Sequence, residues 1–267
     1  DAVKTIASNA FHNCRSLTAV TLPEKMTSIS TEAFYGCSSL TSINIPSAVT
    51  KISKGVFKGC SSLTSLVIPN DVTEIGDYAF EDCSNLTSIN IPNKVTKIGH
   101  AVFHNCSSLP SVIWPSSVTQ INIGVFEGCS SLTEFTIPNS VTSIGSYAFR
   151  DCSKLKAIVI PESISSIAEK TFMGCSSLTE VTIPNTVTSI GSEAFRDCSS
   201  LSTITLPEQI TQISYSTFRG CSSLTSIVIP ELVKSIWGEA FYMCSNLKSV
   251  VIGSSVTNIT NYSFMGC

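Results

Sequence analysis

Charged residues are scarce in this sequence, at 13% of 267 residues, and the formal net charge is only −3. A nucleic-acid-binding protein needs lysine and arginine clustered on one face, and the sequence has no such cluster, so we expect no nucleic-acid partner. No run of about 18 apolar residues occurs, so no membrane-spanning helix is predicted. The first residues also lack the basic start and apolar core of a signal peptide, which says nothing about export because processing would remove one.

Linkers, charge runs and Cys-x-x-Cys pairs are missing too, but cysteine itself is plentiful, and the twelve cysteines all lie 23 residues apart. Phenylalanine keeps this period from Phe11 to Phe264, and proline keeps it from Pro23 to Pro230. Three residue types with one period indicate an internal repeat of about 11.6 copies (267/23). We therefore interpret residues 1–267 as a single domain. Because neither end carries a polar capping coil, we expect either a fragment of a longer protein or end-to-end packing that covers the open layers.

The residues of one copy predict the shape of its coil. In the copy that begins at Leu40, the segment 42–45 alternates polar and apolar residues, which is typical of a short half-buried strand, and Pro46 ends that strand. Val49 and Ile52 indicate a second, very short strand. The spacing of alanine, phenylalanine and cysteine in the rest of the copy predicts a single helical or 3-10 turn. One copy is too small to be stable alone, so the copies must stack into a solenoid.

The full unit reads Leu-x-x-Ile-x-Ile-Pro-x-x-Val-Thr-x-Ile-Gly-x-x-Ala-Phe-x-x-Cys-Ser-Ser. It resembles the Treponema pallidum type of leucine-rich repeat, which defines the BspA-like proteins of mucosal bacteria and of protists such as Trichomonas and Entamoeba. The resemblance implies a right-handed leucine-rich-repeat solenoid of mostly strands and turns, with a parallel sheet on its concave face. It also implies a surface-exposed role in adhesion to host cells or matrix proteins, and it offers no catalytic motif.

The chemistry-bearing residues favour neither a metal site nor catalysis. The cysteines occupy one inward position of the repeat, so we expect buried free thiols rather than disulfides, although stacked neighbours lie within disulfide range. His100 and His104 are four residues apart, with Glu127 one copy beyond, and we interpret them as exposed variable positions rather than metal ligands. Serine and threonine recur in every copy and are therefore structural. We expect no enzyme activity and no cofactor.

Outward strand positions, the third and fifth of each unit, are the most informative place for binding. They are almost uncharged and small, and we predict a binding strip on the concave face centred on Ile113, Glu134, Val159 and Glu180. The alternative is a set of generic strand-forming residues with no ligand. Tryptophan and tyrosine are missing from these positions, which argues against a strong interaction hot spot or a sugar-stacking platform.

One copy departs from the pattern. Pro110 and Trp114 replace the usual threonine and isoleucine, and Phe135 adds a second aromatic in the next copy. We expect a local irregularity there, with packing compensation between the two large side chains.

Two functions remain open. The first is a cell-surface or secreted module that binds a protein or glycan of a host cell or matrix. The second is a cytoplasmic scaffold for protein–protein interactions, which unbridged cysteines and the missing signal would favour.

Overall fold

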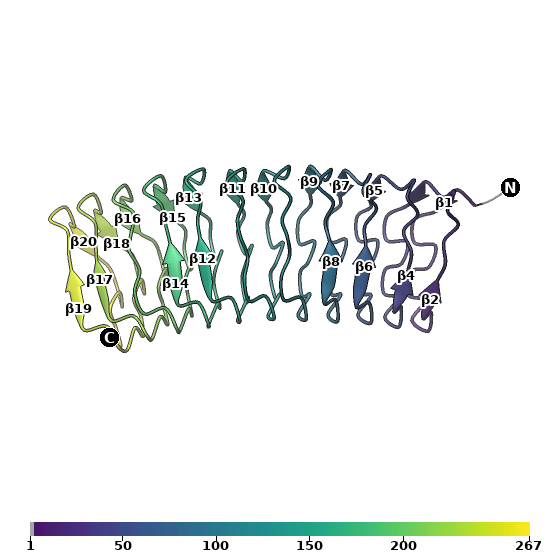
Figure 1. Cartoon of the computed structure of the whole chain (residues 1–267). Coiled ribbons are helices and arrows are strands. Elements are labelled where there is room, and N and C mark those ends of the chain that lie inside the picture. The colour runs from purple at the N-terminus through teal and green to yellow at the C-terminus, as the bar shows by residue number, and fades with distance from the viewer. Residues whose placement is uncertain (1–2) are drawn as a thin grey trace.

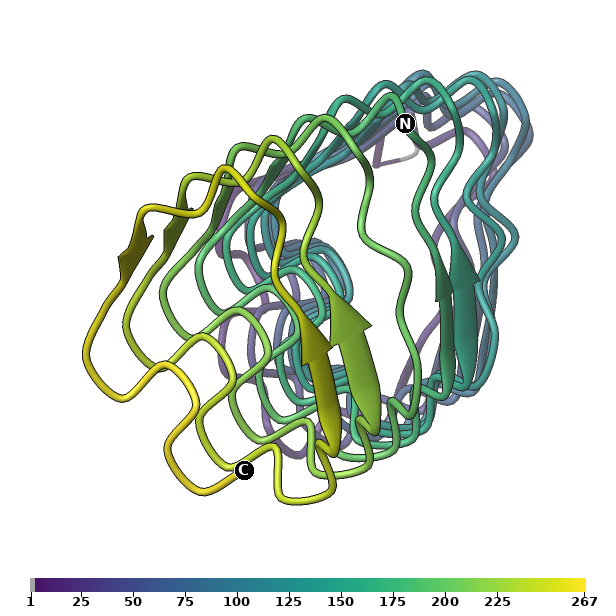
Figure 2. The same cartoon turned by 90° about the vertical axis from the view of Figure 1, so that its left-hand side faces the viewer.

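The computed structural model describes residues 3–267, and it is a solenoid of stacked 23-residue coils that forms an extended, gently curved rod (Figure 1). Every regular element in this range is a short β-strand, and every strand pair is parallel with a register shift of one repeat, as in Ile52↔Ile75. Viewed along the rod, the coils overlay one another and the strands fall on two sides of a common interior (Figure 2). The leucine-rich-repeat solenoid expected from the sequence is therefore confirmed.

The first strand column contains the strands that precede the repeated proline. Its members are β2 (Ala19–Val20), β4 (Ser42–Ile43), β6 (Ser65–Val67), β8 (Ser88–Asn90), β12 (Ala157–Val159), β14 (Glu180–Thr182), β17 (Ser226–Val228) and β19 (Ser249–Val251). They pair only two at a time, as β2–β4, β6–β8, β12–β14 and β17–β19. This column is the parallel sheet that we expected, but its ladder is interrupted between the pairs.

The second strand column is the very short strand predicted after the proline. Its members are β1 (Thr5–Ile6), β3 (Ser28–Ile29), β5 (Lys51–Ile52), β7 (Glu74–Ile75), β9 (Lys97–Ile98), β10 (Gln120–Ile121), β11 (Ser143–Ile144), β13 (Ser166–Ile167), β15 (Ser189–Ile190), β16 (Gln212–Ile213), β18 (Ser235–Ile236) and β20 (Asn258–Ile259). In nearly all of these strands the isoleucine points inward and the preceding polar residue points outward.

The segment between the second column and the cysteine folds as successive turns. Local hydrogen bonds three residues apart, such as Cys37 N–H to Phe34 C=O at 3.2 Å, alternate with bonds to the next coil, such as Phe34 N–H to Val56 C=O at 3.0 Å. Positive φ angles at Glu32 (54°) and Gly36 (69°) stop these turns from continuing as a helix. The expected helical or 3-10 turn is thus present as isolated turns, and no helix forms within residues 3–267.

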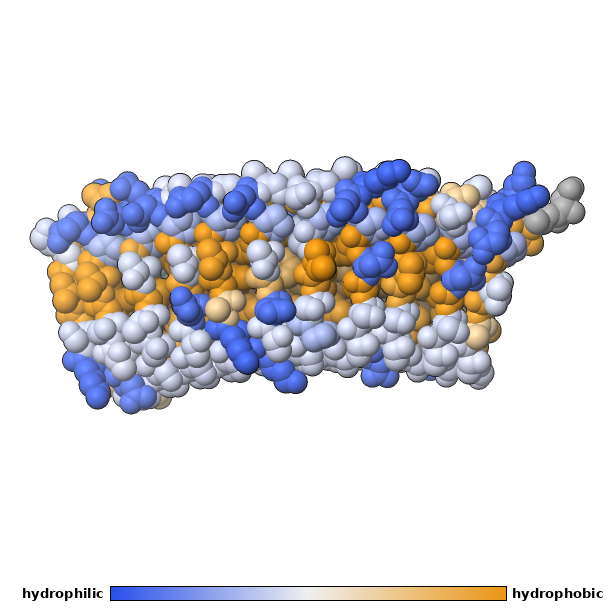
Figure 3. Space-filling model, viewed as in Figure 1, coloured by the Kyte–Doolittle hydropathy of each residue, from blue (hydrophilic) through white to orange (hydrophobic). Residues whose placement is uncertain are grey.

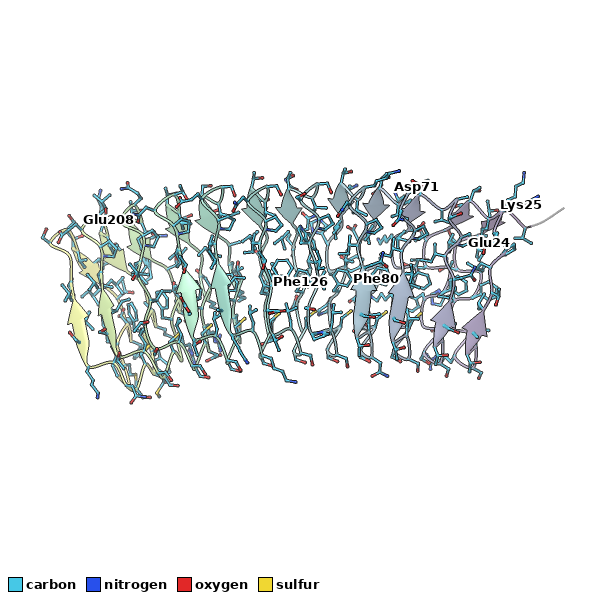
Figure 4. All side chains as sticks on the ribbon, in the orientation of Figure 1. Glu24, Lys25, Asp71, Phe80, Phe126 and Glu208 are labelled. Atoms are coloured by element: carbon cyan, nitrogen blue, oxygen red, sulfur yellow. The ribbon has the colours of Figure 1, made fainter. Side chains whose placement is uncertain are left out.

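Two ladders fill the interior. The repeated phenylalanines stack with ring centroids 4.9–5.9 Å apart in adjacent coils, and Phe80 and Phe126 lie between the two strand columns (Figure 4). Beside them the cysteines stack, and each thiol from Cys37 onward donates to the carbonyl oxygen of a phenylalanine 26 residues earlier at 3.0–3.2 Å. Identical neighbours therefore supply the core that one coil lacks.

The irregular coil lies in the widest interruption of the first strand column, because residues 111–113 and 134–136 form no strand. In most other units the second residue donates to the coil before it, as Thr87 N–H does to Thr64 C=O at 2.8 Å, and Pro110 has no N–H to do so. Trp114 and Phe135 are both buried, with ring centroids 6.1 Å apart in an edge arrangement. The expected packing between them is present.

Candidate binding surface

Outward side chains of the first strand column form one surface, which we call the strand face. It consists of the third and fifth residues of each unit, because successive side chains of a strand point to opposite sides. All four residues predicted to bind lie on it in four successive coils. Ile113 is 87% exposed and Val159 is 63% exposed, and Glu134 and Glu180 are exposed as well. Ala157 and Val159 pair in register with Glu180 and Thr182, so the second half of the strip lies on two paired strands, β12 and β14.

An apolar band runs along the strand face (Figure 3). It contains the exposed aliphatic residues of the fifth position, which are Val67, Ile113, Val159, Val228 and Val251. Polar residues separate some of these side chains, since Val67 pairs with Asn90 and Val159 with Thr182, whereas Val228 and Val251 are direct register partners. Ile113 and Val159 of the predicted strip belong to this band, which extends beyond the strip in both directions.

Two fifth-position residues do not join the band because they bond to the scaffold. The Asn44 side-chain Oδ1 accepts from Leu22 N–H at 2.7 Å, and its Nδ2 donates to Leu22 C=O at 2.9 Å. Asn90 makes the same pair of bonds to Ile68, at 3.0 and 3.2 Å. Each amide bonds to the backbone of the preceding coil as a paired strand would. These two side chains therefore stabilise the stack of coils rather than offering hydrogen bonds to a ligand.

Hollows open on the strand face where the ladder is interrupted. One of about 860 Å³ lies over β4 and β6, and one of about 270 Å³ lies between the segment at Phe135 and β12, beside Val159. A third, of about 810 Å³, lies between the segment 203–206 and β17. The sequence did not predict these hollows, because the residues of the unpaired segments resemble those of paired ones.

The second strand column carries a charge ladder that the sequence analysis missed. Glu74 lies between two lysines, with Lys51 Nζ at 3.1 Å and Lys97 Nζ at 3.0 Å from its carboxylate oxygens. The hydrogen bond from Lys97, aided by Lys51, lowers the pKa of the Glu74 carboxyl below its ordinary value. Opposite charges 23 residues apart at one repeat position were the available signal.

The two histidines and Glu127 do not converge. His104 Nδ1 lies 3.0 Å from an oxygen of Glu81, whereas a carboxylate oxygen of Glu127 lies 3.2 Å from Arg150 Nη1. His100 is exposed. Within residues 3–267 no group of three His, Cys, Asp or Glu side chains is arranged to hold a metal ion.

All twelve cysteines are free, and ten of them are buried. Burial raises the pKa of these ten thiols, to about 12 at Cys244, and it raises the pKa of the interior thiols still further. The thiolate is the reactive form of cysteine, so the buried ladder is inert as a nucleophile in the folded protein. The expected free ladder is therefore what the structure contains.

Residues 3–267 contain no helix that is long and apolar enough to cross a bilayer.

Comparison with known proteins agrees with the repeat. The sequence matches the family described as BspA type leucine rich repeat region (6 copies) over residues 1–110, 50–178, 96–221 and 142–267. A leucine rich cell surface protein of Faecalibacterium prausnitzii A2-165 is similar at 34% identity, over 99% of this chain and 81% of that one, with a TM-score of 0.71. A leucine-rich repeat protein of Bacteroides ovatus is similar at 28% identity, over 99% and 80%, with a TM-score of 0.57. No curated protein matches the chain. Overlapping matches thus span the sequence from end to end, and the chain belongs to the BspA-type leucine-rich-repeat family.

Proposed function

We propose that this chain is a binding module displayed at the cell surface or secreted, and that it attaches to proteins or glycans of a host cell or matrix through its strand face. The observation that carries the proposal is the exposed apolar band, because folded proteins rarely leave so many aligned aliphatic side chains in water without a partner. Family membership supports a binding role, and a similar structure from F. prausnitzii is described as a cell surface protein.

The centre of the proposed contact is the strip of Ile113, Glu134, Val159 and Glu180. Two exposed carboxylates beside two exposed aliphatic residues suit a partner that combines apolar and basic groups. We expect no catalysis, because the interior thiols are inert and the outward residues are aliphatic, small or singly charged. The single-domain organisation of residues 1–267 is part of the same proposal.

A binding screen against immobilised matrix proteins and glycans tests this function. For any binder found, the variant Glu134→Ala/Glu180→Ala should weaken binding by up to about thirtyfold, since each exposed ion pair contributes about 0.2–1 kcal/mol. Glu24→Ala is the matched control, because this carboxylate is also exposed but lies five coils from Glu134. Binding that is unchanged in the double variant would move the contact off the strip, and a screen without any binder would contradict the proposed function.

The cytoplasmic scaffold remains the second candidate, and the free cysteine ladder favours it, because a reducing cytosol keeps thiols unbridged. Antibody labelling of intact cells of the source organism separates the two. Labelling before permeabilisation supports surface display, and labelling only after permeabilisation supports the scaffold.

A further inference from the structure

The hollow of about 810 Å³ on the strand face has a structural cause. The coil that contains residues 203–206 and the coil of β17 are joined by Thr225 N–H to Ser202 C=O at 3.2 Å and again by Lys234 N–H to Thr211 C=O at 2.9 Å. Between these two bonds β17 pairs only with β19, on its other side. The two coils therefore separate over this stretch and leave an opening within the roughly 300–1,000 Å³ range of ligand pockets.

Apolar side chains dominate the opening. Ile204 and Ile227 belong to its lining, and Val228, Val251 and Leu232 are 61%, 54% and 48% exposed around it. Val228 and Val251 are register partners on β17 and β19, so their side chains form a continuous pair. This is the C-terminal part of the apolar band and does not overlap the strip at Ile113–Glu180.

Two carboxylates stand on the rim of this hollow. Glu208 and Glu231 occupy the same position of the repeat in neighbouring coils, directly after the repeated proline, and Glu208 lies at the edge of the rod (Figure 4). Glu231 accepts hydrogen bonds from Ser254 N–H at 2.9 Å and Ser254 Oγ at 2.7 Å, and these bonds lower the pKa of its carboxyl. The bonds from Ser254 therefore favour the negatively charged form of Glu231.

No basic side chain compensates these charges. The residues that line the hollow include no lysine, arginine or histidine, and within residues 3–267 neither carboxylate has a cationic nitrogen within 4.0 Å. The hollow over β4 and β6 is lined by two carboxylates as well, Glu24 and Asp71, but there Asp71 is paired with Lys94 at 2.6 Å. The C-terminal hollow thus combines exposed aliphatic surface with two uncompensated negative charges.

We propose that this hollow, lined by Val228, Val251 and Leu232 and rimmed by Glu208 and Glu231, binds an extended segment of a partner protein in which lysine or arginine stands next to aliphatic residues. The inference deepens the proposed function and rests on it. The aliphatic residues of the segment cover the valine pair, and its cationic group reaches the rim, where carboxylates favour a guanidinium or ammonium. The same two carboxylates repel sulfated glycans, so the hollow favours a basic protein segment over a sulfated glycan.

Fluorescence anisotropy with defined peptides tests this. The probes are labelled ten-residue peptides in which lysine alternates with valine, glutamate alternates with valine, and lysine alternates with serine. Only the lysine–valine peptide has both features, so it should bind the wild-type chain most tightly. Binding should weaken as salt rises from 0.05 to 0.5 M, because exposed charges are screened.

Variants locate the site. Glu208→Gln/Glu231→Gln should weaken the lysine–valine peptide by about 2- to 30-fold, as expected for two exposed ion pairs. Val228→Ser should independently weaken binding of the lysine–valine peptide. Asp71→Asn, in the hollow over β4 and β6, should leave that binding unchanged. All of these residues are exposed, and circular dichroism of each variant verifies that it folds.

Two results would overturn the inference: equal binding of the lysine–valine and glutamate–valine peptides, or lysine–valine binding that persists in Glu208→Gln/Glu231→Gln. Tighter binding of a labelled heparin oligosaccharide than of the peptide would do so as well. These failures differ from failure of the proposed function, which would appear as the absence of any binder in the matrix screen while the peptide still binds in a charge-dependent way.

Discussion

Replacing two glycines that share a backbone conformation but not a neighbour provides the sharpest test of the stacked geometry. Gly59 and Gly128 both have φ of +73° at the same repeat position. A Cβ at Gly128 would lie 2.3 Å from Asn105 Oδ1 and 3.3 Å from Asn105 Cα, whereas a Cβ at Gly59 would meet only Gly36, at 3.4 Å. An alanine is therefore strained by the left-handed conformation at both sites, but it displaces a neighbouring side chain only at Gly128.

The magnitudes follow from these contacts. The left-handed conformation costs an alanine about 1–2 kcal/mol at either site. Displacing Asn105 breaks its hydrogen bond to Asp82, at 2.9 Å, which adds about 0.5–1.5 kcal/mol at Gly128. We expect Gly59→Ala to lower the free energy of unfolding by about 1–2 kcal/mol and Gly128→Ala by about 1.5–3.5 kcal/mol.

Urea denaturation followed by circular dichroism measures both values, and a third variant separates the two contributions. In Asn105→Gly/Gly128→Ala no side chain remains to be displaced, so the additional cost of Gly128→Ala over Gly59→Ala should disappear relative to Asn105→Gly alone. The reasoning is refuted if Gly59→Ala is as destabilising as Gly128→Ala, or if removing the Asn105 side chain gives no rescue.

Three further predictions concern the thiols, the charge ladder and the irregular coil. Titration with a thiol reagent should modify the exposed Cys267 in the native protein and all twelve cysteines after unfolding, and fewer than twelve after unfolding would reveal disulfides. The Glu74 carboxyl has a lowered pKa in the fold, so its contribution to stability, up to about 1 kcal/mol, is present above its ordinary pKa and lost as the pH falls through the lowered one. Glu74→Gln should therefore be less stable than wild type at pH 7 by urea unfolding, and this difference should shrink as the pH falls below the ordinary pKa of the carboxyl. The Trp114 indole N–H is buried without a hydrogen-bond partner among the described residues, and an unpaired buried group costs about 1–3 kcal/mol, so Trp114→Phe should change the melting temperature little or raise it, and a large fall would contradict this.

The interior of this protein could be predicted from its sequence because each inward position is a column. Cys37, Cys60 and their equivalents form one ladder, and the 23-residue period alone predicts that they are buried together. The same holds for the exposure of Ile113 and Val159, since alternation along a strand decides which side a residue takes. The irregular packing at Trp114 was also predictable, because a larger side chain in a column must be accommodated by its neighbours.

The sequence could not show strand pairing or charge compensation, because both depend on distances between coils whose sequences are similar. Residues 203–205 place an isoleucine between two exposed residues, as β17 does, yet only β17 forms a ladder. Likewise, Asp71 and Glu208 both look like exposed acids, and only the structure shows that Lys94 neutralises one of them. Hydrophobic pattern reports which way a side chain points, whereas pairing and charge compensation depend on separations of an ångström or two.

This difference explains where binding can evolve in such a solenoid. A change in the phenylalanine or cysteine column affects two neighbouring coils at once, as Phe126 shows by stacking on both Phe103 and Phe149 at 5.7 and 5.4 Å. A change at an exposed position, such as Val228 or Glu208, leaves the phenylalanine and cysteine columns and the period intact. Interruptions of the ladder add depth to that otherwise flat face without disturbing the core. The scaffold and the binding surface are therefore set by different positions of one 23-residue unit, and a repeated fold can carry unrepeated chemistry.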